Sequence, residues 1–557
     1  MTAVAALADE YVELLFDIDP LSPAVLGLDP LRTGLGQVSE DAEREHRAAF
    51  ERILARAKAI ESQGLGDQER VTRDVLISAA QGHIDQYDTR SVEFTISDLF
   101  ISPAANLLTI VPMISVADSA QGEAHLERLA AIPEYLREVL GRHRAGVAAG
   151  RLPVAHLVRA AVSFIDRYLA DPGNDPLLRQ QAPDASFAER RTRLLADVVH
   201  PAYAEYRDAL ANEIAPHGRP EERPGVCHLP DGERVYAALA RVHTTTDRDP
   251  EDLHATGLEL IEQLADEYAV LGEKVFGTRE LPEIFHRLRT DPALRWGSAE
   301  ELLDTARSAI TRAERAAPDW FGTIPPQPWV VEPIPSAEAP GAPAAYYLLP
   351  STDGSRPGTY FANTYEVTER FRHAAEVTAF HEAIPGHHFQ LSAALNLTEL
   401  PLLRRLGGFN AYAEGWGLYS ERLAHEMGLY SDDIALLGML SMDSMRAGRL
   451  VVDTGLHAKG WSRQQAIDFL RNATPMPDVE IVAEVDRYIG YPGQALSYMV
   501  GRLEIQRLRA EARRRLGPEF DIKAFHDLVL GGGALPLSVL GDVVGDWVER
   551  VATATAR

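Results

Sequence analysis

The stretch "VTAFHEAIPGHHFQLSAAL", residues 377–395, has a helical pattern that is interrupted in its middle. Pro385 and Gly386 form the interruption, because proline lacks a backbone donor and clashes with the preceding turn, while glycine tolerates irregular backbone conformations. His381 lies before the interruption and His387 lies directly after it. If these two imidazoles lie close together, they can bind one metal ion, and the rest of the chain must then supply the remaining ligands.

The stretch comes close to the helical zinc motif H-E-x-x-H, in which two histidines bind one ion and the glutamate serves as general base. Here Pro385 stands in place of the second histidine. On an ideal helix, His387 would lie about 9 Å along the axis and roughly 120° around it from His381, and His388 about 10.5 Å along it. Neither spacing suits a chelating pair on a regular helix.

Two interpretations of the interruption follow from backbone chemistry. A bulge at Pro385 and Gly386 would bring His387 into the position of the second histidine and leave Glu382 facing a metal-bound water. Alternatively, the first helix ends there and a second one begins, with the histidines capping carbonyl groups. The role of His388 is open under both interpretations.

A third ligand is predicted in "NAYAEGWGLYSERLAHEMG", residues 410–428. Glu414 lies in an apolar, aromatic helix, where a buried carboxylate needs a partner. Two histidines and one glutamate would complete three protein ligands and leave a fourth position open. Glu421 shares nearly the same helix face and is a candidate for supporting a ligand, although its neighbour Arg422 favours a surface ion pair.

A pair of tyrosines in "EVDRYIGYPGQALSYMVGRLEI", residues 484–505, is the candidate for stabilising an oxyanion. Tyr491 and Tyr498 lie on one face if the helix is continuous, and phenols near a metal can donate to a developing negative charge. The alternative is that both are half-buried packing residues.

The helix "MRAGRLVVDTGLHAKG", residues 445–460, places Asp453 and His457 on one face. They are interpreted either as support for a metal ligand or as a substrate clamp together with Arg446 and Arg449. Equally, they could be an internal pair that stabilises the helix.

Helical periodicity dominates the chain and predicts a mainly α fold. It is clearest at residues 124–150, 254–277 and 298–322, and at 461–477, where Ser462 and Gln465 form a predicted capping box. Short β-branched and aromatic runs separated by the turn-rich "DGSRPG" predict a small sheet within residues 321–366. We expect a helical region at 1–320 and a catalytic region at 321–557. The sheet could provide an edge strand for an extended substrate or simply pack a subdomain.

Composition excludes several classes of protein. The chain has 557 residues, 46% of them hydrophobic, and a net charge of −27. Such a charge argues against nucleic-acid and anionic-membrane binding. A single cysteine, Cys227, cannot form an intrachain disulfide, and no apolar run is long enough to predict a membrane span. We therefore expect a cytoplasmic location; no motif indicates an oligomeric state.

Several motifs together resemble a known bacterial family, the domain of unknown function 885 (DUF885). They are "DGSRPGTYFANT", "HEAIPGHHFQ", "AYAEGWGLYSERLA", "RAGRLVVDTGLHAKGWS" and "RYIGYPGQALSYMVG", in this order. The resemblance covers most of the chain. This family is similar to gluzincin-type zinc peptidases such as thimet-oligopeptidase-like and angiotensin-converting enzymes, which carry H-E-x-G-H. The resemblance implies a zincin-like fold with two helical halves around a deep cleft, and favours His387 over His388 as the ligand.

The resemblance also implies a site. It assigns zinc to His381, His387 and Glu414, the general base to Glu382, and oxyanion stabilisation to Tyr491 and Tyr498. Arg487 stands near the position where the related enzymes place a histidine and is a further candidate for stabilising charge. The implied function is a zinc-dependent metallopeptidase that cleaves short peptides, although such ligands also accept Co or Mn. The alternatives are a metal-dependent amidase or esterase, or a catalytically silent binding protein, which would not need Glu382.

Overall fold

The computed structural model describes residues 2–336, 339, 342–351 and 356–555. These residues form a mainly helical fold with one small sheet, as the sequence predicts. The helices before the sheet are α1 (Ala3–Ile18), α2 (Leu21–Val25), α3 (Glu40–Ala59), α4 (Asp67–Asp88), α5 (Pro103–Ile110), α6 (Ser119–Ala148), α7 (Ala155–Ala170), α8 (Ala185–Leu194), α9 (His200–Ala209), α10 (Gly232–Thr244), α11 (Pro250–Phe276), α12 (Leu281–Thr290) and α13 (Ala299–Ala316).

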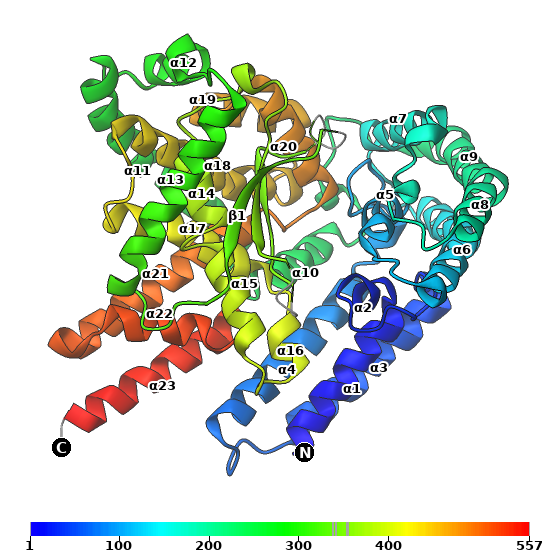
Figure 1. Ribbon diagram of the computed structural model, residues 1–557, viewed down its shortest axis with the longest axis horizontal. Coiled ribbons are helices and arrows are strands. Elements are labelled where there is room, and N and C mark those ends of the chain that lie inside the picture. Colours follow the sequence, from blue (N-terminus) through cyan, green and yellow to red (C-terminus); the bar gives the residue numbers. More distant parts are fainter. Residues whose placement is uncertain (1, 337–338, 340–341, 352–355, 556–557) are drawn as a thin grey trace.

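The sheet and the helices that carry the candidate site follow in the chain. They are β1 (Trp329–Pro333), β2 (Ala345–Leu348), β3 (Gly358–Ala362), α14 (Ala375–Glu382), α15 (His387–Asn396), α16 (Leu402–Leu406), α17 (Asn410–Glu426), α18 (Asp433–His457), α19 (Arg463–Ala473), α20 (Asp478–Gly490), α21 (Leu496–Leu516), α22 (Ile522–Leu530) and α23 (Leu537–Thr555). Figure 1 shows α5 to α9 on one side of the molecule and α11 to α14 on the other.

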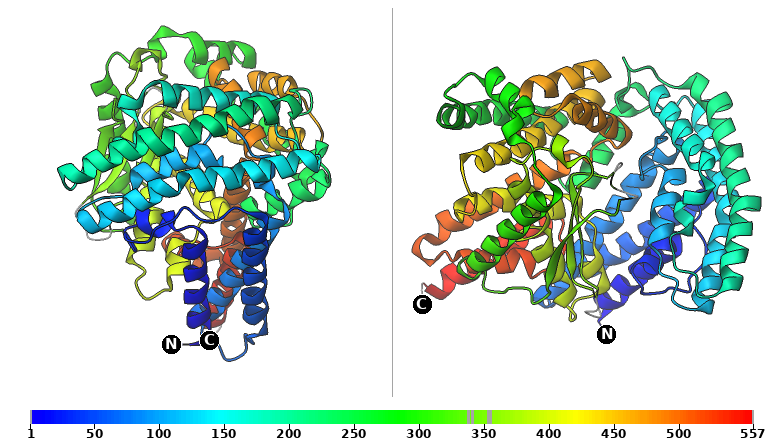
Figure 2. Two further views of the ribbon diagram at one scale, coloured as in Figure 1. Left: turned by 90° about the vertical axis from the view of Figure 1, so that its right-hand side faces the viewer. Right: turned by 45° about the horizontal axis from the view of Figure 1, so that its top comes forward.

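The helices predicted from periodicity are confirmed, and their ends follow ordinary capping chemistry. The side chains of Asp118 and Ser298 cap α6 and α13, and α11 ends at Gly277 in the left-handed conformation. The predicted capping box of Ser462 and Gln465 begins α19. Helix α9 packs against α6 and α7 (Figure 2), and their buried side chains belong to a second core that also includes residues of α2 and α5.

The predicted sheet is present and has three strands in the order β1-β3-β2. Strand β1 pairs with β3 in parallel and β2 pairs with β3 antiparallel, so Tyr360 lies opposite Val331 on one side and Tyr347 on the other. The first half of the predicted turn "DGSRPG", residues 353–355, lies outside the described residues. Both outer strands have a free edge within the described part of the sheet.

The condition that would place Tyr491 and Tyr498 on one helix face, a continuous helix, is not met. Helix α20 ends at Gly490 and α21 begins at Leu496, so a loop separates the two tyrosines. Gly493 in this loop has a φ of +84°, a conformation that is strained for other residues. Proline at the start of the loop and this glycine together explain why the helix cannot continue.

The largest buried core unites both ends of the chain. It contains Leu7 and Phe50 from the N-terminal helices together with Phe380, Trp416 and Val548 from the later ones. The expected division at residue 320 stays a prediction; the core around the candidate site draws on side chains from both sides of it. Among the described helices, none combines the length and apolarity that crossing a membrane requires.

Candidate metal centre

The interrupted stretch forms two helices, and the prediction of a bulge within a single helix is wrong. Helix α14 ends at Glu382, and α15 begins at His387 after a connector that contains a cis peptide bond before Pro385. Trp416 on α17 holds this connector, because its indole nitrogen donates to the carbonyl oxygen of Pro385 at 2.9 Å. The second interpretation was therefore right about the backbone, but the histidines do not cap it.

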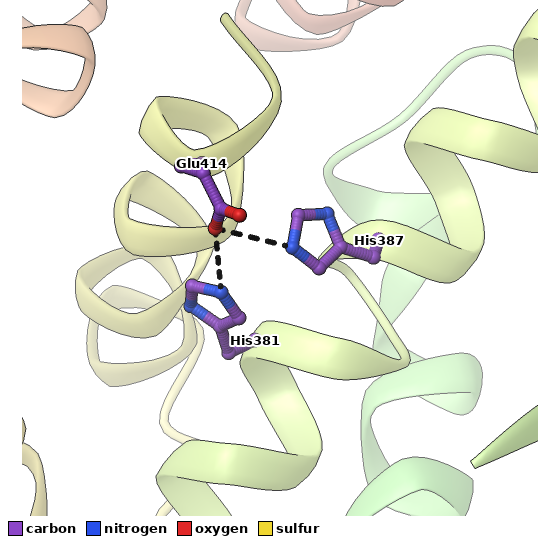
Figure 3. A group of neighbouring side chains, drawn as sticks. All are labelled: His381, His387 and Glu414. Carbon is purple, nitrogen blue, oxygen red and sulfur yellow. Dashed lines mark ion pairs between the residues drawn. The ribbon is translucent and has the colours of Figure 1, made fainter. Parts of the chain in front are cut away.

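His381 and His387 converge on the side chain of Glu414. Their rings are 4.9 Å apart between centroids and nearly perpendicular. Oε2 of Glu414 lies 3.5 Å from Nε2 of His381 and 3.6 Å from Nε2 of His387 (Figure 3). One ligand atom from each of the three residues lies within 4.8 Å of the others. The change of direction between α14 and α15 thus brings the two imidazoles together, which a regular helix could not do.

These distances fit a shared metal ion better than direct hydrogen bonds. An N–H···O bond normally measures about 2.7–3.2 Å, whereas ligand atoms about 2.0–2.1 Å from a tetrahedral zinc ion lie about 3.3–3.4 Å apart. The separations of 3.5 and 3.6 Å are close to the second value. The donor set, two imidazoles and a carboxylate, is also one that zinc accepts.

Glu421 fixes the orientation of His381. Its Oε1 accepts from Nδ1 of His381 at 2.7 Å, and its side chain is fully buried. A proton on Nδ1 leaves the lone pair of Nε2 free for a metal, and buried carboxylates commonly hold metal-binding histidines in this way. The expectation of a surface pair between Glu421 and Arg422 is wrong, because Arg422 instead pairs with Glu267 and Asp443.

Helix α17 shapes the space around His381 as well as supplying Glu414. A Cβ atom on Gly417 would lie 2.7 Å from the imidazole of His381, so only glycine leaves room for the ring. The hydroxyl of Ser420 donates to the carbonyl oxygen of Phe380 at 3.0 Å and ties α17 to α14. Gly417 and Ser420 therefore both serve the packing of α17 against α14.

Negative charge is concentrated around the two imidazoles. Burial opposes a charged His381, but the carboxylates of Glu414 and Glu421 outweigh burial and raise its pKa to about 10. Burial likewise opposes the ionisation of Glu414, yet the imidazoles of His381 and His387 hold its pKa well below the usual range. A buried site with this excess of carboxylate needs a cation or a proton, which fits a metal.

His388 contacts the sheet and not the ligand group. Its Nδ1 lies 2.6 Å from the hydroxyl of Tyr347 on β2, and burial lowers its pKa to about 4. The neutral ring therefore ties α15 to the sheet and does not join the group of His381, His387 and Glu414, consistent with the choice of His387.

Glu382 lines a pocket of about 950 Å³ beside His381. The first residue of β2 and Tyr360 on β3 form part of the wall, and Arg446 and Arg449 on α18 form another part. Burial raises the pKa of Glu382 above its ordinary value. A carboxyl group with a raised pKa can both accept and return a proton near neutral pH.

The predicted tyrosines lie in different surroundings. The guanidinium carbons of Arg446 and Arg449 lie 5.0 and 4.4 Å from the ring centroid of Tyr498, and burial followed by the Glu414 carboxylate raises the pKa of Tyr498. Tyr491 instead lines a second pocket of about 730 Å³, and its ring meets His243 edge-on at 5.0 Å. Tyr498 is thus the tyrosine placed beside the ligand group.

Arg487 contacts residues of α20 and of the loop that follows it. Its guanidinium donates to Glu484 at 3.2 Å and to Gln494 at 2.7 Å. Glu484 also pairs with Arg449 at 2.8 Å. The structure therefore links Arg487 to the arginine that flanks Tyr498, through one shared carboxylate.

Asp453 and His457 do not form the pair or the clamp that the sequence suggested. Asp453 accepts from the hydroxyl of Tyr236 at 2.6 Å and from the backbone nitrogen of Gly493 at 3.0 Å. His457 accepts from the backbone nitrogen of Val226 at 3.1 Å. Both side chains are fully buried and serve to join α18 to other segments, including the loop that carries Tyr491.

Some residues of the site were not predicted. In the sequence, Gly417 and Trp416 stand out only as a glycine and a tryptophan close to Glu414. Their roles depend on how α17 crosses α14, which residue spacing alone does not predict. Arg446 was noted only as part of a clamp.

The comparisons with known proteins agree with the sequence motifs. A family model described as "Bacterial protein of unknown function (DUF885)" matches residues 20–544. The chain belongs to this family. No curated protein matches this DUF885 chain.

Two solved structures resemble the DUF885 chain over nearly its full length. One is a "putative lipoprotein" from Colwellia psychrerythraea, with 27% identity, a TM-score of 0.89 and coverage of 98% of this chain and 99% of that one. The other is a "putative lipoprotein of unknown function" from Shewanella oneidensis, with 18% identity, a TM-score of 0.76 and coverage of 98% and 100%. The second likeness supports the fold alone.

Proposed function

We propose that this protein is a zinc-dependent hydrolase, and specifically a metallopeptidase that cleaves short peptides. The observation that carries the proposal is the convergence of His381, His387 and Glu414 next to Glu382, which faces a pocket large enough for a few amino-acid residues. We also propose that the protein is related to gluzincin-type peptidases and shares their zincin-like arrangement of two helical halves around a cleft.

The three ligands would hold the ion through Nε2 of each histidine and Oε2 of Glu414. The ion they would hold would supply Lewis acidity for the scissile carbonyl group and for the activation of water near neutral pH. Glu421 keeps the proton of His381 on Nδ1, so that Nε2 stays free.

Glu382 would serve as the general base and then as the acid. Its carboxylate takes a proton from the attacking water and passes it to the leaving amine, which needs a group that exchanges protons near neutral pH. Tyr498 would donate its phenolic proton to the oxyanion. The raised pKa of Tyr498 keeps that proton in place. Arg446 and Arg449 add positive charge on the ring face of Tyr498.

Strand β2 supports the choice of a peptide as substrate. It is an outer strand of the sheet, and Ala345 at its start lines the pocket that holds Glu382. An extended peptide can pair with the free edge of such a strand, and its scissile bond then passes the ligand group.

Substrate profiling tests the proposal directly. Zinc-loaded protein is incubated with a library of short peptides and with matched non-peptide amides and esters, and cleavage is followed by mass spectrometry. The proposal predicts cleavage of peptides that is lost in Glu382→Gln. Cleavage of only the non-peptide compounds would favour an amidase or esterase, and no cleavage by metal-loaded protein would favour a binding protein.

We also propose a cytoplasmic location, which rests on composition. The solved relatives described as lipoproteins provide the contrary expectation of a membrane-anchored protein. Fractionation of the source cells, with detection of this chain in soluble and membrane fractions, separates the two.

A further inference from the structure

Arg446 on α18 is a buried arginine without an ionic partner. It is 7% exposed and lines the pocket beside Glu382. Among the residues that the structure describes, no carboxylate lies within ion-pair distance of it, and its Nε has no hydrogen-bond acceptor. Among the described residues, its one side-chain hydrogen bond is to the sulfur of Met445 at 3.5 Å, and its guanidinium carbon lies 5.0 Å from the ring centroid of Tyr498. Burying a charge in this way is costly unless a partner arrives from elsewhere.

Other arginines in the same wall also lack acidic partners. Arg289, Arg295 and Arg370 line the pocket and donate to backbone carbonyl oxygens, and within the described residues none of them forms an ion pair. Arg449 has one terminal nitrogen without an acceptor. The chain has a net charge of −27, yet these pocket arginines have no carboxylate partner among the described residues.

The glutamates of the wall do not supply the missing partner. They are Glu369, Glu382, Glu480 and Glu484. Glu484 is already paired with Arg449 and Arg487, and Glu382 is the proposed base beside the ligand group. Positive charge therefore remains at Arg446, within the pocket that we assign to the substrate, and guanidinium groups bind carboxylates through two parallel hydrogen bonds.

We propose that Arg446 binds a carboxylate group of the substrate, so that the enzyme prefers peptides that place a carboxylate close to the scissile bond. This inference rests on the proposed peptidase function and names its substrate class. The carboxylate is the C-terminal group of a short peptide or the side chain of an acidic residue, and both would pair with Arg446 while the backbone lies along the pocket.

Binding without turnover tests the inference. Zinc-loaded Glu382→Gln is titrated by calorimetry with one N-acetylated tripeptide as the free acid, with its C-terminal amide, and with an amide whose last residue is glutamate. The free acid should bind roughly 10- to 100-fold more tightly than the plain amide, since a hydrogen bond to a charged group is lost. Tighter binding of the free acid assigns Arg446 to the C-terminal carboxylate, and tighter binding of the glutamate amide alone assigns it to an acidic side chain.

The double variant Glu382→Gln/Arg446→Met shows whether Arg446 is responsible. The ratio of affinities between acid and amide should fall to about one. Equal binding of all three peptides with Arg446 intact would overturn the inference and leave the peptidase proposal standing. Failure of all three peptides to bind would instead overturn both.

A stability measurement separates ligand binding from a structural role. Arg446→Met removes an uncompensated charge, so its Tm should equal or exceed that of the wild type. Arg404→Met is the matched control, because Arg404 is 1% exposed and donates to the carbonyl oxygen of Gly532 and to Thr72. Arg404→Met should lower the Tm. A similar fall in Arg446→Met would make Arg446 structural and contradict the proposal.

Discussion

Glu382 and Glu421 both lie beside His381 and face different groups. Glu421 is fully buried and accepts the Nδ1 proton of His381, whereas Glu382 lines the pocket. Neither is one of the three ligand residues, so each can be replaced without removing a donor atom from the ion. The two glutamates therefore allow catalysis and metal binding to be tested separately.

Replacing Glu382 should abolish turnover and spare the metal. Glu382→Gln keeps the size of the side chain and loses the proton-accepting group, so the rate of peptide cleavage should fall by about 10²- to 10⁴-fold. Zinc content and cleavage rate are measured on the same preparation. An active Glu382→Gln would refute the assignment of the base.

Replacing Glu421 should weaken metal binding. Glu421→Ala removes the acceptor for His381 and should lower zinc affinity by about 10- to 100-fold, while Glu421→Gln keeps a carbonyl acceptor and should lower it less. Competition with a chromogenic chelator measures both. Wild-type affinity in Glu421→Ala would show that the buried hydrogen bond does not orient the ligand.

At the scale of elements, the crossing of α14 and α17 determines the geometry of the site. Helix α17 supplies Glu414, makes room at Gly417 and anchors the connector through Trp416. The connector itself turns α15 away from α14 so that His387 comes back towards His381. The packing of α14 against α17 is thus as important to the geometry of the site as the ligand residues themselves.

Adding one methyl group at Gly417 should disturb the site specifically. Gly417→Ala places a Cβ 2.7 Å from the ring of His381, so zinc affinity should fall by about tenfold or more as the imidazole is displaced. Gly141→Ala on α6 is the matched control, because nothing lies within 4 Å of its Cβ. It should keep zinc affinity and gain about 0.5–1 kcal/mol of stability. Equal zinc affinity in both variants would contradict the packing argument.

Sequence patterns predicted these elements unevenly. The 3.6-residue periodicity and the capping box identified helices such as α6 and α19, and the resemblance to enzymes with H-E-x-G-H selected His387 to join His381 and Glu414. The patterns left open whether the helix before Pro385 ends or bulges and whether the helix carrying Tyr491 is continuous, because a Pro-Gly pair is compatible with a bulge, a kink or a break. The burial of Glu421 depended on the packing of α17 against α14, which no local pattern encodes.

At the scale of the whole molecule, the site lies within the core that joins both ends of the chain. His381 and Glu421 are buried among side chains of that core. A ligand that binds only the folded state stabilises the entire cooperative unit and not just one helix. Metal binding should therefore be visible in global unfolding.

Removing the metal should lower the unfolding temperature of the protein. A ligand at about 100 times its Kd stabilises the folded state by about 2.7 kcal/mol. Thermal unfolding is followed by circular dichroism after chelator treatment and after zinc is restored. His387→Ala should show no response to either treatment, and a wild-type response in that variant would place the metal elsewhere.

The most direct test of the account is the zinc content of protein purified without a histidine tag or added metal, measured by elemental analysis beside His387→Ala and His388→Ala. The account predicts close to one zinc per chain in the wild type and in His388→Ala, because His388 contacts Tyr347, and loss of zinc in His387→Ala. A wild type that holds no metal even after reconstitution, or zinc lost only in His388→Ala, would contradict it.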